Sequence, residues 1–196
     1  MMLGAFANPV FDSQRTFRQL LQAMARPAVP RALPVLPPSP APIAPAAMAI
    51  VLTLCDATTS VWLQQPEDEA VRHVRFHAGL KWVEEPHQAD FAVISDAMAM
   101  PPLATFALGD PRYPDRSATL IIQVAAIHAS PASTGGVSFA GPGIRDTQTV
   151  AIDGLPPDFW HQRAALAAQL PLGIDLFFVA GQHVLALPRT TRLLED

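Results

Sequence analysis

The side chains best placed for chemistry lie near the C-terminus. Asp175 stands at the start of the apolar run Ile174–Val179, and Arg189 follows the apolar run Val184–Leu187. A buried carboxylate needs a partner, and an arginine offers a fork of donors to a carboxylate or another anion. Two interpretations follow: an Asp175–Arg189 ion pair that fixes the C-terminal segment, or an anion site that includes the neighbouring Thr190.

A glycine-rich stretch, SFAGPGIRD at residues 138–146, is the nearest approach to a nucleotide-binding loop. Its backbone amides could hold a phosphate, with Arg145 as the counter-charge. However, Pro142 removes one donor, and neither the GxGxxG nor the GxxxxGK[ST] spacing is present. Pro-Gly between two predicted strands favours a type II turn.

Two histidines, His73 and His77, have the HxxxH spacing of a metal site. Val74, Arg75 and Phe76 between them favour a strand, in which residues four apart are roughly 13 Å from each other. No glutamate follows His73 as in HExxH. We therefore expect solvated or hydrogen-bonded histidines and no metal site.

Cys55 and Lys81 limit the cofactor chemistry, because each is the one residue of its type in the chain. One thiol cannot hold an iron–sulfur cluster or make an internal disulfide. Cys55 lies on an apolar helix, where burial raises a thiol pKa, so we expect a core residue. The chain as a whole is typical of a reducing compartment, and we expect no cofactor.

The composition indicates one folded domain over residues 1–196. Half of the residues are apolar, 15% are charged and the net charge is −4. Disorder needs lower hydrophobicity and more charge, and nucleic-acid binding needs clustered Lys and Arg, which are absent. The uncharged stretch 32–55 contains six prolines, so we expect no membrane span. The N-terminus has no signal-peptide pattern, which predicts a cytoplasmic protein.

The N-terminal third predicts two helices joined by an extended arm. The first begins at Asp12 or Ser13 and ends before Pro27, with Phe17, Leu20, Leu21 and Met24 on one face. Residues 27–45 hold eight prolines, which favours a polyproline-like arm crossing the same domain. Pro45 suits the first turn of a second helix that ends near Cys55.

The rest of the chain alternates between strands and helices, which predicts a layered α/β domain. Helical segments are expected at 67–73 and 159–170. Strands are expected at 60–63, 74–77, 90–94, 119–126, 136–140, 148–152, 174–179 and 184–187.

Several blocks of the sequence form a set: FRQLLQAM at 17–24 followed by Pro27, VLTLCD at 51–56 with VWL at 61–63, RFH at 75–77, ATLIIQV at 118–124, GPGI at 141–144, PLGIDL at 171–176 and LPRTT at 187–191. Together, in the same order and over nearly the whole chain, they resemble the PhnH family, subunits of the bacterial carbon–phosphorus lyase system. The proline-rich arm and residues 84–102 match least.

The resemblance implies a role in breaking down organic phosphonates. It implies a three-layer α/β/α sandwich with a mixed central sheet, similar to the pyridoxal-phosphate-dependent transferases, and a homodimer in isolation. It also implies a core complex with the G, I and J subunits that transfers methylphosphonate to the ribose of ATP. The lysine count predicts this fold without its cofactor, because Lys81 has no adjoining Ser or Thr for a phosphate.

The residues leave one alternative open, a stand-alone enzyme or binding protein for a phosphorylated small molecule. Such a protein would bring Arg116, Arg145 and Arg189 into one cleft. In the non-catalytic interpretation, these arginines have structural roles and share no ligand.

Overall fold

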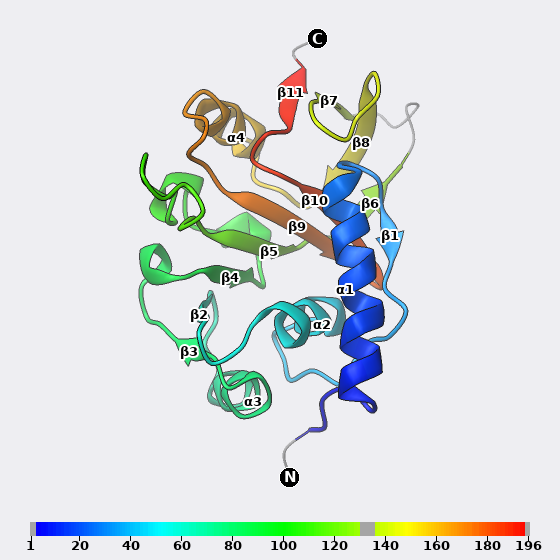
Figure 1. The fold of residues 1–196 in the computed structure, drawn as a ribbon, viewed down its shortest axis with the longest axis vertical. Coiled ribbons are helices and arrows are strands. Elements are labelled where there is room, and N and C mark those ends of the chain that lie inside the picture. Colours follow the sequence, from blue (N-terminus) through cyan, green and yellow to red (C-terminus); the bar gives the residue numbers. More distant parts are fainter. Residues whose placement is uncertain (1–2, 130–135, 195–196) are drawn as a thin grey trace.

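A seven-stranded mixed sheet forms the centre of the molecule (Figure 1). The structure is a computed structural model that describes residues 3–129 and 136–194. The strand order is β1-β10-β9-β5-β4-β2-β3; β2, β3, β4, β5 and β9 are parallel, and β10 and β1 are antiparallel to their neighbours. The strands are β1 (Arg31–Ala32), β2 (Ser60–Leu63), β3 (Lys81–Trp82), β4 (Phe91–Ile94), β5 (Thr119–Gln123), β9 (Asp175–Ala180) and β10 (His183–Leu187).

Three helices cover one face of this sheet: α1 (Pro9–Ala25), α2 (Pro45–Leu54) and α3 (Asp68–Ala78) (Figure 1). Helix α2 has no charged residue, and its positions 46–51 are all buried, because it lies between the sheet and the other two helices. Its Pro45 occupies the first helical turn, as predicted.

The other face carries one α-helix, α4 (Phe159–Ala167), and a second sheet. This four-stranded sheet has the order β11-β7-β8-β6 and is antiparallel throughout. Its strands are β6 (Ala126–His128), β7 (Val137–Ala140), β8 (Gln148–Asp153) and β11 (Arg192–Leu194). The mixed central sheet is confirmed, but the third layer is only partly helical.

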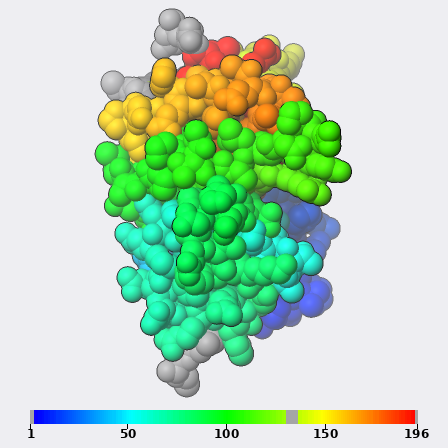
Figure 2. Space-filling view, turned by 90° about the vertical axis from the view of Figure 1, so that its left-hand side faces the viewer, coloured from blue at the N-terminus to red at the C-terminus, as the bar shows by residue number. Residues whose placement is uncertain are grey.

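Short 3₁₀ turns complete the second face: η1 (Pro86–Gln88), η2 (Ala97–Ala99) and η3 (Leu103–Thr105). Figure 2 shows the green segment that contains η2 and η3 between the yellow-orange α4 region and the α3 region. Packed aromatic rings fill the core beneath α4, with Phe159 and Trp160 against Phe178 and Phe139.

The predicted strand at 74–77 is wrong, since His73 and His77 both belong to α3. Acidic Asp68 and Glu69 in the first turn and basic residues in the last turn complement the helix dipole. Gly79 then ends the helix in the left-handed region, at φ +68°. These terminal signals outweigh the strand preference of the β-branched and aromatic residues between the histidines.

Three further boundaries differ from the prediction. Helix α4 ends at Ala167 rather than at residue 170, and residues 168–170 form a turn. Helix α1 begins at Pro9 rather than at Asp12 or Ser13, because proline suits the first turn and the Asp12 carboxylate accepts a hydrogen bond from the Asn8 amide at 2.9 Å. The apolar run 119–126 is not one strand: β5 ends at Gln123, and Ala126 begins β6 in the second sheet.

The proline-rich arm at 27–45 crosses the sheet edge and is fastened to it. The prediction of a polyproline-like arm is wrong at Arg31 and Ala32, because these two residues form a sheet strand that pairs with β10. The backbone amide of Leu33 also donates to the Gln182 carbonyl at 2.9 Å. In the part of the chain that the structure describes, no helix combines the length and hydropathy needed to cross a bilayer.

Candidate functional site

Asp175 and Arg189 form an ion pair at the amino-terminal end of β9. Arg189 Nη2 lies 2.6 Å from Asp175 Oδ2, and the backbone amide of Arg189 donates to Oδ1 at 2.7 Å. The guanidinium also donates to the Pro114 carbonyl and to the Ser117 hydroxyl. Both side chains are about four-fifths buried. This geometry is that of an internal clamp, because these interactions engage both carboxylate oxygens and most of the guanidinium donors.

A second arginine, Arg163 of α4, holds the same C-terminal turn from the opposite side. It is 3% exposed, and its Nη2 donates to the carbonyls of Pro188 at 2.7 Å and Thr191 at 3.3 Å. Burial lowers the Arg163 pKa, although Asp175 acts in the opposite direction. Together, Arg163 and Arg189 fix the turn between β10 and β11, which joins the two sheets.

Two glycines allow the backbone of this turn to approach its neighbours. A Cβ added at Gly141, where φ is +143°, would lie 3.0 Å from the Thr190 carbonyl oxygen. A Cβ added at Gly173 would lie 3.3 Å from Arg189 Cβ. Three separate sequence blocks, GPGI, PLGIDL and LPRTT, therefore meet in one packed junction. We call this the arginine junction: Arg163, Asp175 and Arg189 with the turn 188–191.

Among the described residues, none of the remaining predicted site residues makes a hydrogen bond or ion pair with the guanidinium of Arg189. Arg116 is exposed and stacks over the Tyr113 ring, with its Cζ 4.1 Å from the ring centroid. The Arg145 side chain is 97% exposed and has Asp146 as its nearest anion, at 3.9 Å. Thr190 is exposed at the outer corner of the turn. Among the described residues, no hydrogen bond or ion pair joins Arg116, Arg145 and Arg189.

An apolar groove of about 410 Å³ lies beside the arginine junction, at the amino-terminal edge of the parallel strands. One wall is α1 and the other contains Leu54 and Phe91, while Thr119 and Asp175 contribute its polar atoms. The complete lining is Phe17, Leu20, Leu21, Met24, Leu54, Phe91, Thr119, Asp175, Phe177 and Pro188.

The opposite, carboxyl-terminal edge is the usual ligand site of parallel α/β sheets, at the point where neighbouring strands connect in opposite directions. That point lies here between β2, which leads outward to β3, and β4, which leads inward to β5. Gln64 bridges it: its Nε2 donates to the Asp96 carbonyl at 2.9 Å, and its Oε1 accepts from the Asp96 amide at 2.8 Å.

Gln123, the last residue of β5, closes the adjacent position against the proline-rich arm. Its Oε1 accepts from the Ala44 amide at 2.6 Å, and its Nε2 donates to the carbonyls of Pro42 at 3.1 Å and Ser95 at 3.2 Å. The side chains of Gln64 and Gln123 thus use the polar groups at the strand ends for internal hydrogen bonds. We call Gln64, Gln123 and residues 42–44 of the arm the edge seal.

A hollow of about 480 Å³ lies outside the edge seal, between the arm and the start of α3. Glu67, Asp68 and Glu69 line it with a single arginine, Arg72. Three carboxylates against one guanidinium repel a phosphate, so this hollow does not suit a phosphorylated ligand.

The histidine pair and the cysteine lie in apolar surroundings on the helical face. The His73 ring is 1% exposed, and neither of its nitrogens has a hydrogen-bond partner among the described residues, so the expectation of a solvated or hydrogen-bonded side chain is wrong for His73. Its centroid lies 4.5 Å from that of His77. Burial, and next the neighbouring His77, lower the His73 pKa. Burial raises the pKa of Cys55 to about 12, which confirms the expected core thiol.

No group of three or more His, Cys, Asp or Glu side chains gathers as a metal site within residues 3–129 and 136–194. The pair His73–His77 is closer than predicted, because a helix places residues four apart on one face. His77 Nε2 lies 3.0 Å from the Leu3 carbonyl, so one of its nitrogens already has a partner.

The edge seal went unrecognised in the sequence. Gln64 follows the predicted strand 60–63 and Gln123 lies inside the predicted strand 119–126, but an isolated glutamine carries no motif. The only available signal was the position of polar amides directly after the apolar runs 61–63 and 119–122. The hydrogen-bond partners come from the arm and from the loop after β4, which no local pattern connects to them.

Comparison with known proteins identifies the protein family. A family model described as "Bacterial phosphonate metabolism protein (PhnH)" matches residues 4–194. The subunit PhnH of alpha-D-ribose 1-methylphosphonate 5-triphosphate synthase from Rhizobium meliloti is 40% identical over 192 residues, 97% of this chain and 94% of that protein. The putative C-P lyase subunit protein HtxG of Stutzerimonas stutzeri is 37% identical over 90 residues, 46% of this chain and 44% of that protein.

The molecule is therefore a bacterial phosphonate-metabolism protein of mixed α/β fold. More specifically, the chain belongs to the PhnH family, and the family model extends over both sheets and all four helices. The arginine junction, the groove and the edge seal all fall within the matched residues.

Proposed function

We propose that this chain is a non-catalytic subunit of the carbon–phosphorus lyase core complex. In that role, it is needed for the transfer of methylphosphonate to the ribose of ATP and contributes contact surface to the assembly. We propose further that residues 1–196 act as one domain in the cytoplasm, with a fold related to the pyridoxal-phosphate-dependent transferases.

The observation that carries the proposal is the edge seal. In parallel α/β proteins, the crevice beyond the strand carboxyl ends receives the ligand. Here, Gln64 and Gln123 consume the polar groups of that crevice in bonds to Asp96, Ser95 and the arm. Arg189, the strongest anion-binding candidate of the sequence, is held by Asp175.

The related proteins support assembly with other chains, because both are named as subunits of larger enzymes. We propose the G, I and J subunits as partners, and a homodimer when the chain is alone. Exposed apolar side chains on α1 support contact with another subunit, since a soluble monomer rarely leaves such patches open.

The test is reconstitution of phosphonate transfer from ATP and methylphosphonate. The complete set of subunits should produce the ribose product, omission of this chain should abolish it, and this chain alone should produce none. Turnover by the isolated chain would contradict a non-catalytic role.

A second measurement concerns the cofactor. Lys81 is exposed on β3, the outermost strand, and we expect no Schiff base there. Incubation with pyridoxal phosphate followed by borohydride reduction should leave Lys81 unlabelled. Stoichiometric labelling of the Lys81 peptide would contradict the proposal.

A further inference from the structure

Helix α1 carries a seam of the kind found in paired helices. Positions 10, 14, 17, 21 and 24 follow the alternating four-and-three spacing that keeps side chains on one face of a helix. Four of the five are apolar, namely Val10, Phe17, Leu21 and Met24. Val10 is 75% exposed, Phe17 47% and Leu21 54%, whereas Met24 packs against the core, so most of the seam stays uncovered by the described residues.

The seam and the apolar groove form one continuous surface. Phe17, Leu21 and Met24 belong to both, and Leu54 and Phe91 face them across the groove. The seam runs from position 10 to position 24 of α1, which gives it a length of roughly 21 Å at 1.5 Å per residue. A surface of this shape, an apolar trough beside a helix, matches the helix-in-groove mode of recognition.

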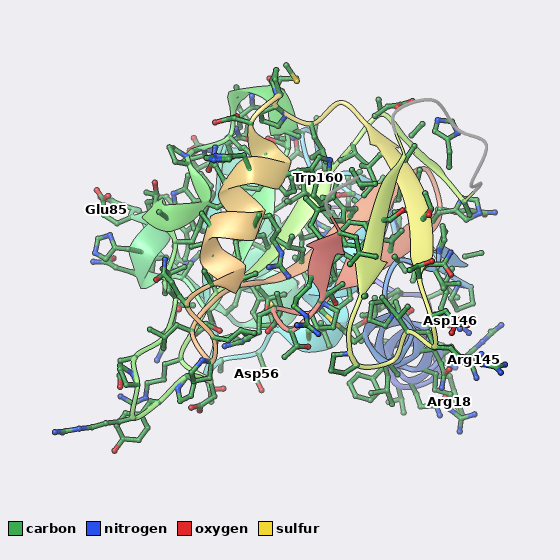
Figure 3. The ribbon with its side chains drawn as sticks, turned by 90° about the horizontal axis from the view of Figure 1, so that it is seen from above. Arg18, Asp56, Glu85, Arg145, Asp146 and Trp160 are labelled. Atoms are coloured by element: carbon green, nitrogen blue, oxygen red, sulfur yellow. The ribbon has the colours of Figure 1, made fainter. Side chains whose placement is uncertain are left out.

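The two rims of the trough carry opposite charges. Arg18 lies on the open side of the seam, and the one acid of α1, Asp12, is 8% exposed and bonded to the Asn8 amide. On the other rim, Asp56 and Asp90 are exposed next to Leu54 and Phe91. Figure 3 shows Arg18 and Asp56 projecting from the same side of the molecule, with Arg145 labelled beside Arg18.

A second copy of this chain does not fit the trough. Its own α1 has one flank packed into its body, where Thr16, Leu20 and Ala23 are buried, so that helix cannot wedge between two walls. If two seams instead paired antiparallel about a two-fold axis through Phe17, only residues close to that axis would lie beside their own copies. Arg18, one residue from the axis, would lie beside Arg18 of the copy, and the two like charges would repel each other.

We propose that the trough between α1 and the rim formed by Leu54, Asp56 and Phe91 receives an amphipathic helix from another subunit of the complex. That helix has an apolar ridge, an acidic residue facing Arg18 and a basic residue facing Asp56. The inference rests on the proposed function, because it assigns a surface to the partner contact.

The binding test uses the full chain co-expressed with the G, I and J subunits. Leu21→Glu places a charge in the seam and should reduce the co-purified partner by more than about tenfold, the loss typical of a central interface residue. Arg18→Glu should weaken binding less, and addition of salt should narrow its difference from the wild type. Phe76→Glu, at an apolar position of α3 that is 71% exposed, is the matched control and should co-purify normally.

Two readouts keep folding and oligomerisation separate from docking. The thermal midpoint of Leu21→Glu should equal that of the wild type, because the side chain is more than half exposed. Its hydrodynamic mass in isolation should also be unchanged. Dissociation of an isolated dimer by Leu21→Glu would overturn the proposal in favour of a second copy.

A photo-crosslinking residue at position 17 then identifies the occupant. The expected product joins Phe17 to one helical peptide of the G, I or J subunit with apolar residues at three- and four-residue spacing and an acidic flank. Crosslinks to this chain itself, or an intact complex with no crosslink at position 17, would overturn the proposal. If the wild-type chain does not co-purify with the subunits, the proposed function itself fails, which is a different result.

Discussion

The two edges of the parallel strands have opposite characters. At the carboxyl-terminal edge, the side-chain amides of Gln64 and Gln123 form hydrogen bonds within the chain, and the proline-rich arm lies across the opening. At the amino-terminal edge, an apolar groove stays open beside α1, and Asp175, the partner of Arg189, is part of its lining. The usual ligand edge of an α/β sheet is thus closed and the opposite edge is available, which favours binding of a protein over binding of a substrate.

The largest predicted effect concerns the ion pair at the open edge. Arg189→Met leaves the Asp175 carboxylate, about four-fifths buried, without its cation, and we expect unfolding to become easier by about 3 kcal/mol, the low end for a buried pair because both groups keep some solvent contact. Urea denaturation measures this. Arg145→Ala, at a 97% exposed side chain, should change the value by less than about 0.5 kcal/mol.

These two variants test whether the Asp175–Arg189 ion pair stabilises the fold. If Arg189→Met kept full stability, the arginine junction would not be a structural clamp, and Arg189 would again be a candidate for anion binding.

The next effect concerns the closed edge. Gln123→Leu removes the acceptor of the Ala44 amide and the donor to Pro42 and Ser95, so a half-buried amide loses its bond at a cost of about 1–3 kcal/mol. Hydrogen exchange at Ala44 should accelerate, while amides within β9 keep their protection. Unchanged exchange at Ala44 would mean that Gln123 does not hold the arm.

The smallest effect concerns a group close to neither edge. Because burial lowers the pKa of His73 below its ordinary value of 6.5, the unfolded chain takes up this proton more readily than the folded protein. Stability from His73 is therefore complete above pH 6.5 and declines as the pH falls below it. Glu69 acts in the opposite direction.

Denaturation at pH 7 and pH 5 measures this contribution. His73→Leu should reduce the loss of unfolding free energy between the two pH values, whereas His87→Leu, at an exposed position, should not. An identical pH dependence in His73→Leu and the wild type would show that other groups carry it.

Sequence reasoning performed best where one local rule acted alone. The apolar helix at Pro45 and the strands at Ser60, Gln148 and Val184 follow from composition and proline placement, and the structure confirms them within about one residue. The Asp175–Arg189 contact was also named in advance, because a carboxylate at the start of a buried strand has few possible partners.

It failed where two rules competed or where the partners were distant. At His73–His77, the prediction followed the strand preference of the side chains between the histidines. The structure instead follows the charged helix ends and Gly79, which belong to α3. The edge seal depends on contacts between residues about 80 positions apart, such as Ala44 with Gln123, and no periodicity reports them. In the small sheet, β7 and β8 match predicted strands, but Ala126 of β6 was joined to the run 119–126, β11 was not predicted, and nothing assigned these strands to a separate layer.

The position of β10 has a consequence for the order in which the molecule can be built. Strand β1 pairs with β10 alone, and β9 and β10 lie between it and the rest of the large sheet. During synthesis, Arg31 and Ala32 leave the ribosome long before β10 (His183–Leu187), the strand that they join. The proline-rich arm must wait for β10, so a nascent or truncated chain without β10 exposes an unpaired sheet edge that invites aggregation.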